Sequence, residues 1–375
     1  MALSPLLAAL STDCAKGTQP LRVGAYRGAE AAACFSTPGR EFSALLHGCG
    51  VYDLGYRARI SLTGGDRTRW LNGMVTNNIR DLAVGRGVYT FLLNPQGKIL
   101  GDMYCYHLGE SIVVETDLSQ VEKILATFDH YIIMDDVEVK NVSEGQTVVG
   151  SAGPNARAVL KDAGIEIPEL QPLQIGKARC TCDCECVECT VVRGEDAQEA
   201  YELWLAPKDV RKTWQALIAA GAVPVGSEAL EMQRIAAGIP LYGVDIRERE
   251  LPQETEQMRA LNFNKGCYVG QEIVERIRSR GNVHRKFSGF LAESGKAIAA
   301  GEKIFAGEKE IGEITSSAVL PTESGERTVA LGYIRREVGL PGREVIIGSV
   351  KATVIQLPLA GVASAQRDDA VLHKA

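Results

Sequence analysis

The sequence predicts an α+β protein with two similar lobes of helices and strands, followed by a small β-barrel. Three patterns support this fold class. Helical and strand periods are mixed over short links in the first part of the 375-residue chain, without the repeated crossovers of a parallel sheet. A strand followed by a helix at 111–128 has a counterpart at 201–218. From 287 to 357, short apolar segments are separated by glycines and show no helical period, which indicates a barrel.

In the first lobe, strands are expected at 51–54, 58–62, 88–93, 103–108, 111–115, 137–139 and 147–150. Residues 64–66 precede a short helix, in which Trp70, Leu71 and Met74 share one face. A second helix at 121–128 carries apolar residues on one side. Residues 94–98 are rich in Asn, Pro and Gly, so they predict a turn between two strands.

The second lobe begins with a helix that Pro154 opens, and it continues with a strand at 201–205 and helices that start at Pro207 and Ser227. A further helical period follows residue 272, and Gly281 marks its end. These patterns place the two lobes at 1–150 and 151–283. The barrel is expected at 284–360 and a tail at 361–375.

Composition disfavours several classes of protein. Hydrophobic residues make up 45% and charged residues 23% of the chain, as in soluble globular proteins. The net charge of -6 disfavours a protein that coats nucleic acid, because such binding depends on Lys and Arg that neutralise phosphates. No apolar run reaches membrane-spanning length, and residues 1–10 lack the basic start of an export signal, so we expect a cytoplasmic protein. No G-x-G-x-x-G or P-loop spacing predicts a nucleotide site.

Half of the ten cysteines stand within ten residues, at Cys180, Cys182, Cys184, Cys186 and Cys189. On one strand the first four would share a face, and across a hairpin they would meet. Four thiolates within reach could bind zinc or an iron–sulfur cluster. However, the spacing matches no common zinc or ferredoxin pattern. We therefore expect reduced thiols and no bound metal.

Residues 265–272 read Lys-Gly-Cys-Tyr-Val-Gly-Gln-Glu, which places a cation, a thiol and two glycines directly before a predicted helix. The positive end of the helix and the ammonium of Lys265 would both favour the thiolate form of Cys267. The glycines would let backbone N–H groups approach an anion. Cys267 and Lys265 are therefore candidate catalytic residues. The alternative is that Cys267 is a small buried residue in an ordinary turn.

These eight residues resemble the signature K-G-C-Y-x-G-Q-E of the YgfZ family of folate-binding proteins, relatives of the glycine-cleavage T-protein, an aminomethyltransferase. The segments at 251–254 (L-P-Q-E) and 64–77 extend the resemblance. It implies binding of tetrahydrofolate or a one-carbon derivative. It also implies support of iron–sulfur cluster assembly or repair and, through iron–sulfur enzymes, of tRNA modification. Iron–sulfur proteins or assembly factors would be its partners. The protein would not bind RNA directly and would not associate with a membrane.

The main alternative is an aminomethyltransferase of the glycine cleavage system, which would be a folate-dependent one-carbon transferase. It would need a lipoyl-protein partner and a working acid at Asp102, and its family does not ordinarily carry a cysteine in the K-G-C position. A folate-dependent demethylase module fits less well, because no dinucleotide-binding pattern is present. The sequence leaves open whether any reaction is catalysed.

A folate has a flat pterin with amide-like edges, an aromatic linker and an anionic tail, so its site needs a carboxylate, an apolar slot and cations. The folate-binding residues expected from the resemblance are Glu202, Arg234, Tyr201, Trp204, Tyr268 and Gln271. Glu202 stands in a Tyr-Glu-Leu segment similar to the one with which the T-protein holds the pterin. The alternatives are a solvent-facing glutamate on an edge strand and, for Arg234, a solvated helix face.

Asp102 is the third candidate catalytic residue. Residues 94–102 resemble the T-protein segment N-x-x-G-x-x-x-D-D, whose carboxylate acts near the reactive nitrogens of the folate, and Asp102 keeps one of its two acids. An ordinary strand-edge aspartate is the alternative. A basic stretch directly after the signature could bind the anionic tail or phosphates. It consists of Arg276, Arg278, Arg280, His284, Arg285 and Lys286.

Overall fold

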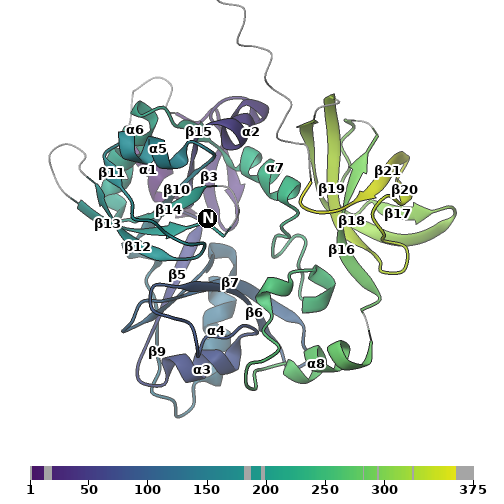
Figure 1. Cartoon of the computed structure of the whole chain (residues 1–375), viewed down its shortest axis with the longest axis horizontal. Helices are drawn as coiled ribbons and strands as arrows, with labels where there is room; N and C mark the ends of the chain where they lie inside the picture. The colour runs from purple at the N-terminus through teal and green to yellow at the C-terminus, as the bar shows by residue number, and fades with distance from the viewer. Residues whose placement is uncertain are drawn as a thin grey trace, which may run out of the picture. The chain divides into compact units, whose positions relative to one another are not determined.

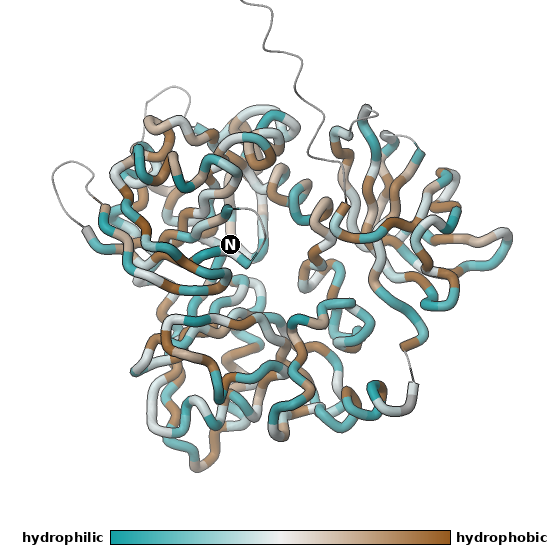
Figure 2. Tube along the Cα trace, in the orientation of Figure 1, coloured by the Kyte–Doolittle hydropathy of each residue, from teal (hydrophilic) through white to brown (hydrophobic). Residues whose placement is uncertain are grey.

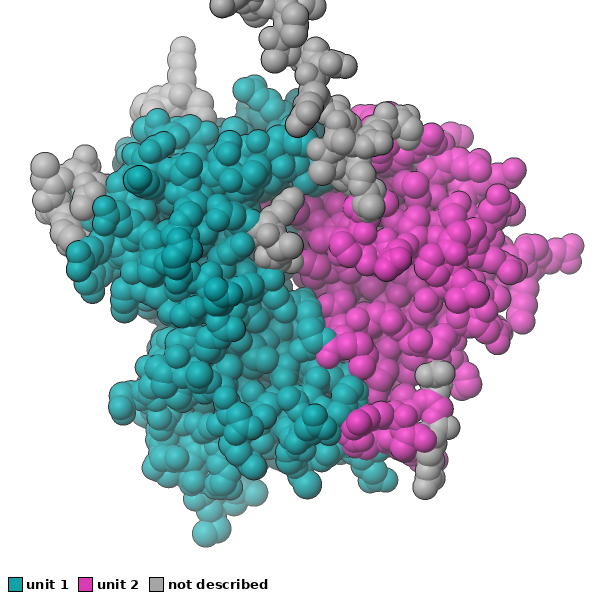
Figure 3. All heavy atoms as spheres, in the orientation of Figure 1, with its two compact units in different colours: residues 1–229, 259–272 teal, residues 230–258, 273–375 magenta. Residues whose placement is uncertain are grey.

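The computed structural model of the chain describes residues 2–11, 19–180, 187–195, 199–281, 283–293, 295–322 and 325–359. Contacts divide the chain into two compact units (Figure 3). Unit 1 comprises residues 1–229 and 259–272, and unit 2 comprises residues 230–258 and 273–375. The signature at 265–272 therefore belongs to unit 1. The lobe boundaries at 150 and 283 remain predictions.

Unit 1 is built on three sheets (Figure 1). The five-stranded sheet has the order β6 (Gly87–Leu93), β7 (Ile99–His107), β8 (Ile112–Asp117), β5 (Arg57–Thr63) and β9 (Glu138–Asn141). The seven-stranded sheet has the order β11 (Ile165–Glu166), β12 (Ile175–Cys180), β13 (Val187–Arg193), β14 (Ala200–Leu205), β10 (Thr147–Ala152), β4 (Gly50–Asp53) and β15 (Val223–Val225). The small sheet has the order β1 (Ala2–Leu3), β3 (Ala29–Cys34) and β2 (Arg22–Tyr26).

Helices cover one face of each large sheet. The α-helices of unit 1 are α1 (Pro5–Ser11), α2 (Pro38–His47), α3 (Arg67–Met74), α4 (Val121–Tyr131), α5 (Ala156–Asp162) and α6 (Val210–Ala219). In α3, Trp70, Leu71 and Met74 are buried, as predicted, and they pack with Phe128 of α4 on the five-stranded sheet. Residues of α1, α5 and α6, such as Trp214, form a second core on the seven-stranded sheet. Each sheet therefore keeps one face free for other side chains.

Short 3-10 helices lie between these elements, at Leu118–Gln120, Ser143–Gly145, Pro207–Asp209, Pro252–Thr255 and Met258–Ala260. The chain passes between the units within α7 (Ser227–Ala237), within the 3-10 helix Met258–Ala260 and within α8 (Gln271–Arg280). None of the helices in the described ranges has the length and apolar character that crossing a membrane requires.

Unit 2 contains a closed six-stranded barrel. Its order is β16 (Arg285–Ala292), β19 (Gly325–Arg335), β18 (Lys309–Thr322), β17 (Lys303–Ala306), β20 (Glu344–Ile347) and β21 (Val350–Ile355). Phe290, Ile304 and Ile334 are among the residues that fill its interior, and apolar stretches are visible along its strands in Figure 2. A Cβ at Gly332 would overlap the carbonyl group of Glu313, so close strand contact requires glycine there. The predicted fold class, mixed α+β followed by a barrel, is confirmed.

Candidate functional site

The helix-free face of the five-stranded sheet carries a row of polar side chains. Tyr89 on β6 pairs with Tyr104 on β7, Tyr104 pairs with Glu115 on β8, and Glu115 pairs with Arg59 on β5. Directly paired residues point to the same face of a sheet, so these four side chains lie in line across four strands. The apolar neighbours on the same strands, such as Met103, point into the helix-covered core. Strand alternation thus separates a polar face from an apolar one.

Ion pairs hold this row together. Arg59 Nη2 lies 3.0 Å from Glu115 Oε2, with side-chain exposures of 0% and 1%. Arg57 Nη1 lies 3.4 Å from Asp117 Oδ1, and Arg57 Nε lies 3.8 Å from Glu115 Oε1. Removing such charges from water costs several kcal/mol per ion, so a buried ion pair is weak evidence for stability. Four charged groups on one buried face are therefore a reason to look for a function.

The seven-stranded sheet contributes Glu202 and Trp204 of β14 to the same place. The guanidinium of Arg59 lies 4.2 Å from the ring centroid of Trp204, and the rings of Tyr106 and Trp204 meet edge to face at 5.6 Å. Tyr201, next to Glu202, points to the opposite face, where it is buried in the core. There its hydroxyl accepts from Arg157 Nη1 at 3.3 Å. The structure therefore brings Glu202 and Trp204 together with Arg59 and does not bring Tyr201 with them.

Glu202 has an electrostatic environment that suits a ligand. Burial and the nearby charge of Glu115 raise the pKa of Glu202 to about 7, while Arg57 and Arg59 act in the opposite direction. Among the described residues, Glu202 Oε2, Trp204 Nε1 and Arg59 Nη1 are buried without a hydrogen bond of good geometry, although the Trp204 N–H is close enough to Glu202 to lower the pKa of its carboxyl group. Leaving such a group unsatisfied costs about 1–3 kcal/mol. A ligand with both donors and acceptors would recover this free energy, and the flat donor edge of a pterin fits that requirement.

Asp102 is held rigidly on β7. Tyr89 donates from its hydroxyl to Asp102 Oδ2 at 2.7 Å, and Gln120 Nε2 donates to Asp102 Oδ1 at 2.8 Å. The Asp102 N–H in turn donates to Gln120 Oε1 at 3.0 Å. Burial and the charge of Asp117 raise the pKa of Asp102, whereas the two hydrogen bonds and Arg57 lower it. The carboxyl group is thus fixed in one orientation and can take up a proton more readily than an exposed aspartate.

Arg259, in the segment that precedes the signature, lies over the ring of Tyr89, whose hydroxyl donates to Asp102. Its guanidinium is 4.3 Å from the ring centroid of Tyr89, and it pairs with Glu195. Tyr104 also donates to Glu195, at 3.3 Å. Neither Arg259 and Glu195 nor the paired charges of β5 and β8 were predicted as site residues from the sequence. A signal was present in Arg-x-Arg at 57–59 and Glu-x-Asp at 115–117, because charges two residues apart on a strand share one face.

Lys265 anchors the signature to α3. Its ammonium donates to the carbonyl oxygens of Asn72 at 2.6 Å, Val75 at 2.6 Å and Asn77 at 2.7 Å. The last carbonyls of a helix have no partner within it, so Lys265 caps the C-terminus of α3. Burial lowers the pKa of Lys265 to about 7, while three carbonyl acceptors, one for each N–H donor, favour the charged form. These donors point to the backbone of residues 72–77 rather than to a thiol.

Cys267 is exposed, which excludes the alternative of a buried core residue. Tyr268 is buried, and the Lys265 ammonium lies 5.0 Å from its ring centroid. Gln271 is the first residue of α8, and its N–H donates to the Tyr268 carbonyl at 3.2 Å. The signature is therefore a structured turn that exposes the thiol of Cys267 to solvent, while the ammonium of Lys265 caps α3.

Arg234 belongs to unit 2. It is buried on α7 and pairs with Asp245 and Glu231, each at 2.7 Å. Its Nη1 also donates to the Ile239 carbonyl at 2.7 Å, so the contacts that the structure shows hold the turn after α7. In the basic stretch, Arg285 pairs with Glu254 at 3.0 Å. The positive charge of the basic stretch is thus partly neutralised within unit 2.

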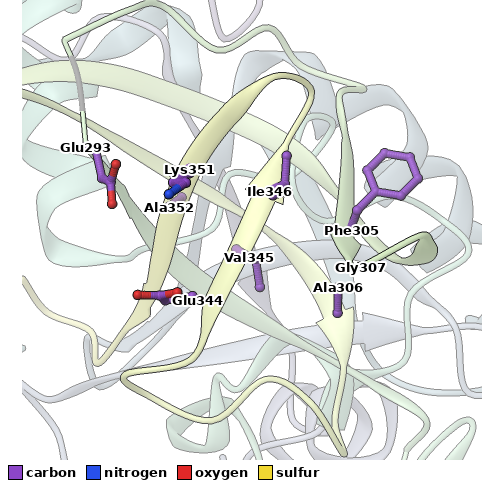
Figure 4. Close-up of a pocket in the computed structure, with 9 residues that line it drawn as sticks. All are labelled: Glu293, Phe305, Ala306, Gly307, Glu344, Val345, Ile346, Lys351 and Ala352. Atoms are coloured by element: carbon purple, nitrogen blue, oxygen red, sulfur yellow. The ribbon is translucent and has the colours of Figure 1, made fainter.

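Unit 2 has cavities of its own on the barrel. One of about 200 Å³, shown in Figure 4, is lined by Phe305 of β17, by Glu344 and Ile346 of β20 and by Lys351 of β21. It is smaller than the usual 300–1,000 Å³ of a ligand pocket. A larger one of about 580 Å³ is lined by Arg249 and Lys303, which already pair with Glu313. Neither combines unsatisfied buried groups in the way the Glu202 region does.

Comparison with known proteins agrees with this geometry. A family model described as GCVT N-terminal domain matches residues 15–265, and one described as Glycine cleavage T-protein C-terminal barrel domain matches residues 285–360. The aminomethyltransferase of Streptomyces avermitilis is 29% identical over 350 residues, which are 91% of this chain and 90% of that protein. The aminomethyltransferase of Halothermothrix orenii is 27% identical over 333 residues, which are 85% of this chain and 90% of that protein.

Among solved structures, the glycine cleavage system aminomethyltransferase T from Bartonella henselae is similar with a TM-score of 0.82 and 23% identity. The match covers 94% of this chain and 96% of that chain, and it supports the fold. The first family model alone covers more than half of the chain, and the second covers the barrel. The chain therefore belongs to the glycine cleavage T-protein family, whose members include the aminomethyltransferases.

Proposed function

We propose that unit 1 binds tetrahydrofolate or a one-carbon derivative, with Glu202 on the donor edge of the pterin. The observation that carries this proposal is the buried Glu202 Oε2 without a hydrogen bond of good geometry among the described residues. Arg59 and Trp204 lie beside it, also with unsatisfied buried donors. An aromatic ring system with an amide-like edge offers both the donors and the acceptor that these atoms lack.

We further propose that the chain is a folate-dependent aminomethyltransferase. Tetrahydrofolate, when bound, supplies two nitrogens that accept a one-carbon unit from an aminomethyl thioether, so that the carrier thiol and ammonia are released. Asp102 would hold or release a proton in this reaction, since Tyr89 and Gln120 fix its two oxygens in one orientation. Arg57 and Asp117 set the charge around it. The names of the relatives support this function.

A second function is favoured by Cys267. The exposed thiol in a K-G-C-Y-x-G-Q-E turn is the feature that resembles the YgfZ family. In that case the chain would bind folate without aminomethyl turnover and would support iron–sulfur cluster assembly or repair, with effects on tRNA modification. Iron–sulfur proteins or assembly factors would then be its partners. This proposal rests on the signature, since the relatives reported above are named aminomethyltransferases.

One experiment separates these functions. The purified chain is incubated with tetrahydrofolate and an aminomethyl-lipoyl carrier protein, and ammonia release is measured. For an aminomethyltransferase, Asp102→Asn should lose about 10²–10⁴-fold in rate, the usual contribution of a positioned acid–base group. Glu202→Gln should weaken folate binding by about 1.5–3 kcal/mol in calorimetry, while the exposed Glu166→Gln should not.

Folate binding without ammonia release would leave the YgfZ-type function, which is then tested by rescue of iron–sulfur enzyme activity with Cys267→Ala as the negative variant. Equal folate affinity of the wild-type chain and Glu202→Gln would contradict the site itself. Absence of folate binding would contradict both functions.

A further inference from the structure

Two features of unit 1 are not part of the proposed site, the cysteine-rich segment and the turn between β2 and β3. In the first, the Sγ atoms of Cys180 and Cys189 are 3.5 Å apart, and neither cysteine forms a disulfide. Cys182, Cys184 and Cys186 lie outside the described residues, so the absence of a metal there stays a prediction. The turn between β2 and β3, in contrast, has contacts that lead to the proposed acid.

Arg27 and Gly28 form this two-residue turn. Their φ angles are 49° and 99°, and a type I′ hairpin turn requires a positive φ at both positions. Glycine adopts a positive φ freely, whereas other residues seldom do. The Arg27 side chain is also mostly buried, with its guanidinium 5.0 and 5.3 Å from the ring centroids of Tyr26 and Tyr56. The backbone angle and the burial of a charge both disfavour arginine here, which indicates a role for its contacts.

The backbone of the turn lies directly against the 3-10 helix Leu118–Gln120. The Ser119 N–H donates to the Arg27 carbonyl at 3.2 Å. A Cβ added to Gly28 would lie 2.5 Å from the Ser119 nitrogen and 2.9 Å from the Leu118 carbonyl carbon, closer than real Cβ atoms come. Glycine is therefore required at this point of contact.

The same 3-10 helix holds Asp102. Gln120 is its last residue, and the Gln120 side chain forms hydrogen bonds with both the carboxyl group and the N–H of Asp102. The first residues of the helix are fixed by two carbonyl acceptors, because the Leu118 N–H donates to Tyr56 and the Ser119 N–H to Arg27. The turn thus holds the helix, and the helix holds the acid.

The guanidinium of Arg27 provides a second connection, through charge. Arg27 Nη1 lies 3.5 Å from Asp117 Oδ2, and Arg57 Nη1 lies 3.4 Å from Asp117 Oδ1, so this carboxylate has a cation on each oxygen. Burial and the charge of Asp117 raise the pKa of Asp102, because like charges disfavour ionisation. Arg27 offsets the charge of Asp117 and with it this effect.

Other charged and titratable groups of the cluster come from the neighbouring strands and the segment before the signature. They are Arg57 and Arg59 of β5, Tyr89 of β6, Tyr104 of β7, Glu115 and Asp117 of β8, and Arg259. Arg27 is the member of this cluster that the β2–β3 turn contributes.

We propose that the turn between β2 and β3 is a positioning element for Asp102, with Gly28 and Arg27 as its positioning residues. Gly28 fixes the orientation of the carboxyl group through the 3-10 helix and Gln120, and Arg27 limits the influence of Asp117 on its ionisation. The inference rests on the proposed function, since it assigns both residues a part in the reaction that Asp102 serves.

Gly28→Ala tests the orientation. Gly24→Ala, on β2 of the same hairpin, is the matched control, because nothing lies within 4 Å of a Cβ at Gly24. In the ammonia-release assay, Gly28→Ala should lower kcat at least about tenfold, since a misplacement of about 1 Å can cost about 10²-fold. The Kd for tetrahydrofolate should not change, because Glu202 and Trp204 stand on the other large sheet. Circular dichroism checks that both variants fold.

Arg27→Met tests the charge without depending on turnover. The ligand-free chain is labelled with ¹³C at the aspartate carboxyl groups, Asp102→Asn identifies the Asp102 signal, and its titration is followed by NMR. Arg27→Met should move this titration to higher pH, and Arg27→Lys should restore it. Arg22→Met is the control, because Arg22 is an exposed arginine of the same hairpin that pairs with Glu228.

An unchanged titration of Asp102 in Arg27→Met, or an equal shift in Arg22→Met, would overturn the proposal. Equal kcat values for folded Gly28→Ala and Gly24→Ala would do the same. If the wild-type chain binds folate but releases no ammonia, the aminomethyltransferase function fails, and the NMR titration alone decides the role of the turn.

Discussion

Replacing Glu202 by glutamine should change how the stability of unit 1 depends on pH. The pKa of Glu202 in the folded chain is about 7, above its ordinary value of 4.5, because burial and Glu115 disfavour the carboxylate. The folded state therefore holds a proton that the unfolded state releases between these two values. The stabilisation is fully present below about pH 4.5 and is lost as the pH rises through about 7.

The size of this effect follows from the shift in pKa. At about 1.4 kcal/mol per unit, a rise from 4.5 to about 7 corresponds to about 3 kcal/mol. The Glu202 side chain is partly accessible to solvent, so screening by water reduces the expected effect to about 1–3 kcal/mol. Glutamine has nearly the same shape and no charge to titrate. Between about pH 5 and about pH 8, the wild-type chain should lose about 1–3 kcal/mol more stability than Glu202→Gln.

Urea unfolding without ligand measures this difference. The chain has three tryptophans, Trp70, Trp204 and Trp214, and all belong to unit 1, so their fluorescence reports on that unit. Glu166→Gln is the control, because Glu166 is an exposed glutamate on β11 of the same unit. Parallel stability curves for the wild-type chain and Glu202→Gln would show that Glu202 titrates like an exposed carboxylate, and the argument for an unsatisfied site would fail.

Four other substitutions, the last two used as a pair, test further contacts in unit 1. Lys265→Met removes the cap of α3 and should cost at least about 1.5–3 kcal/mol in urea unfolding, the value of a hydrogen bond to a charged group; an unchanged stability would refute the capping role. Tyr89→Phe removes a donor that lowers the pKa of Asp102, so the acidic limb of a pH–rate profile should move to higher pH. Arg59→Leu leaves the buried Glu115 with only the more distant Arg57 as a charged partner and should cost up to about 3–5 kcal/mol, and adding Glu115→Leu should recover part of the loss. Additive losses would mean that the pair is not coupled.

Local patterns were sufficient for much of the fold. The spacing of Trp70, Leu71 and Met74 predicted the buried face of α3, and glycine-separated strands predicted the barrel. The strand β3 was not expected, because its small residues, Ala-Glu-Ala-Ala-Ala-Cys, lack the β-branched and aromatic residues typical of strands. Tyr201 and Glu202 are adjacent on a strand, so alternation alone could have predicted that their side chains lie on opposite faces of the sheet.

The site itself depends on contacts that no local pattern contains. Arg59 meets Glu115 because β5 pairs with β8, and it meets Trp204 because a second sheet approaches the same face. Lys265 was assigned to the thiol of Cys267, two residues away, but its partners are backbone carbonyls 188 to 193 residues earlier in the chain. Every residue has a backbone carbonyl, so the residue types in a sequence do not show which carbonyls a lysine will contact.

Arg59 also links the two carboxyl groups on which the proposed site depends. It pairs with Glu115 and lowers the pKa of Glu202, whereas Glu115 raises it. Without ligand, these opposing charges leave Glu202 close to half protonated at neutral pH. A ligand that donates hydrogen bonds to Glu202 favours the carboxylate, so binding at neutral pH must release part of a proton. Folate affinity should consequently rise from about pH 5 to about pH 7 and level off above it, and this dependence should disappear when Glu202 is replaced by glutamine.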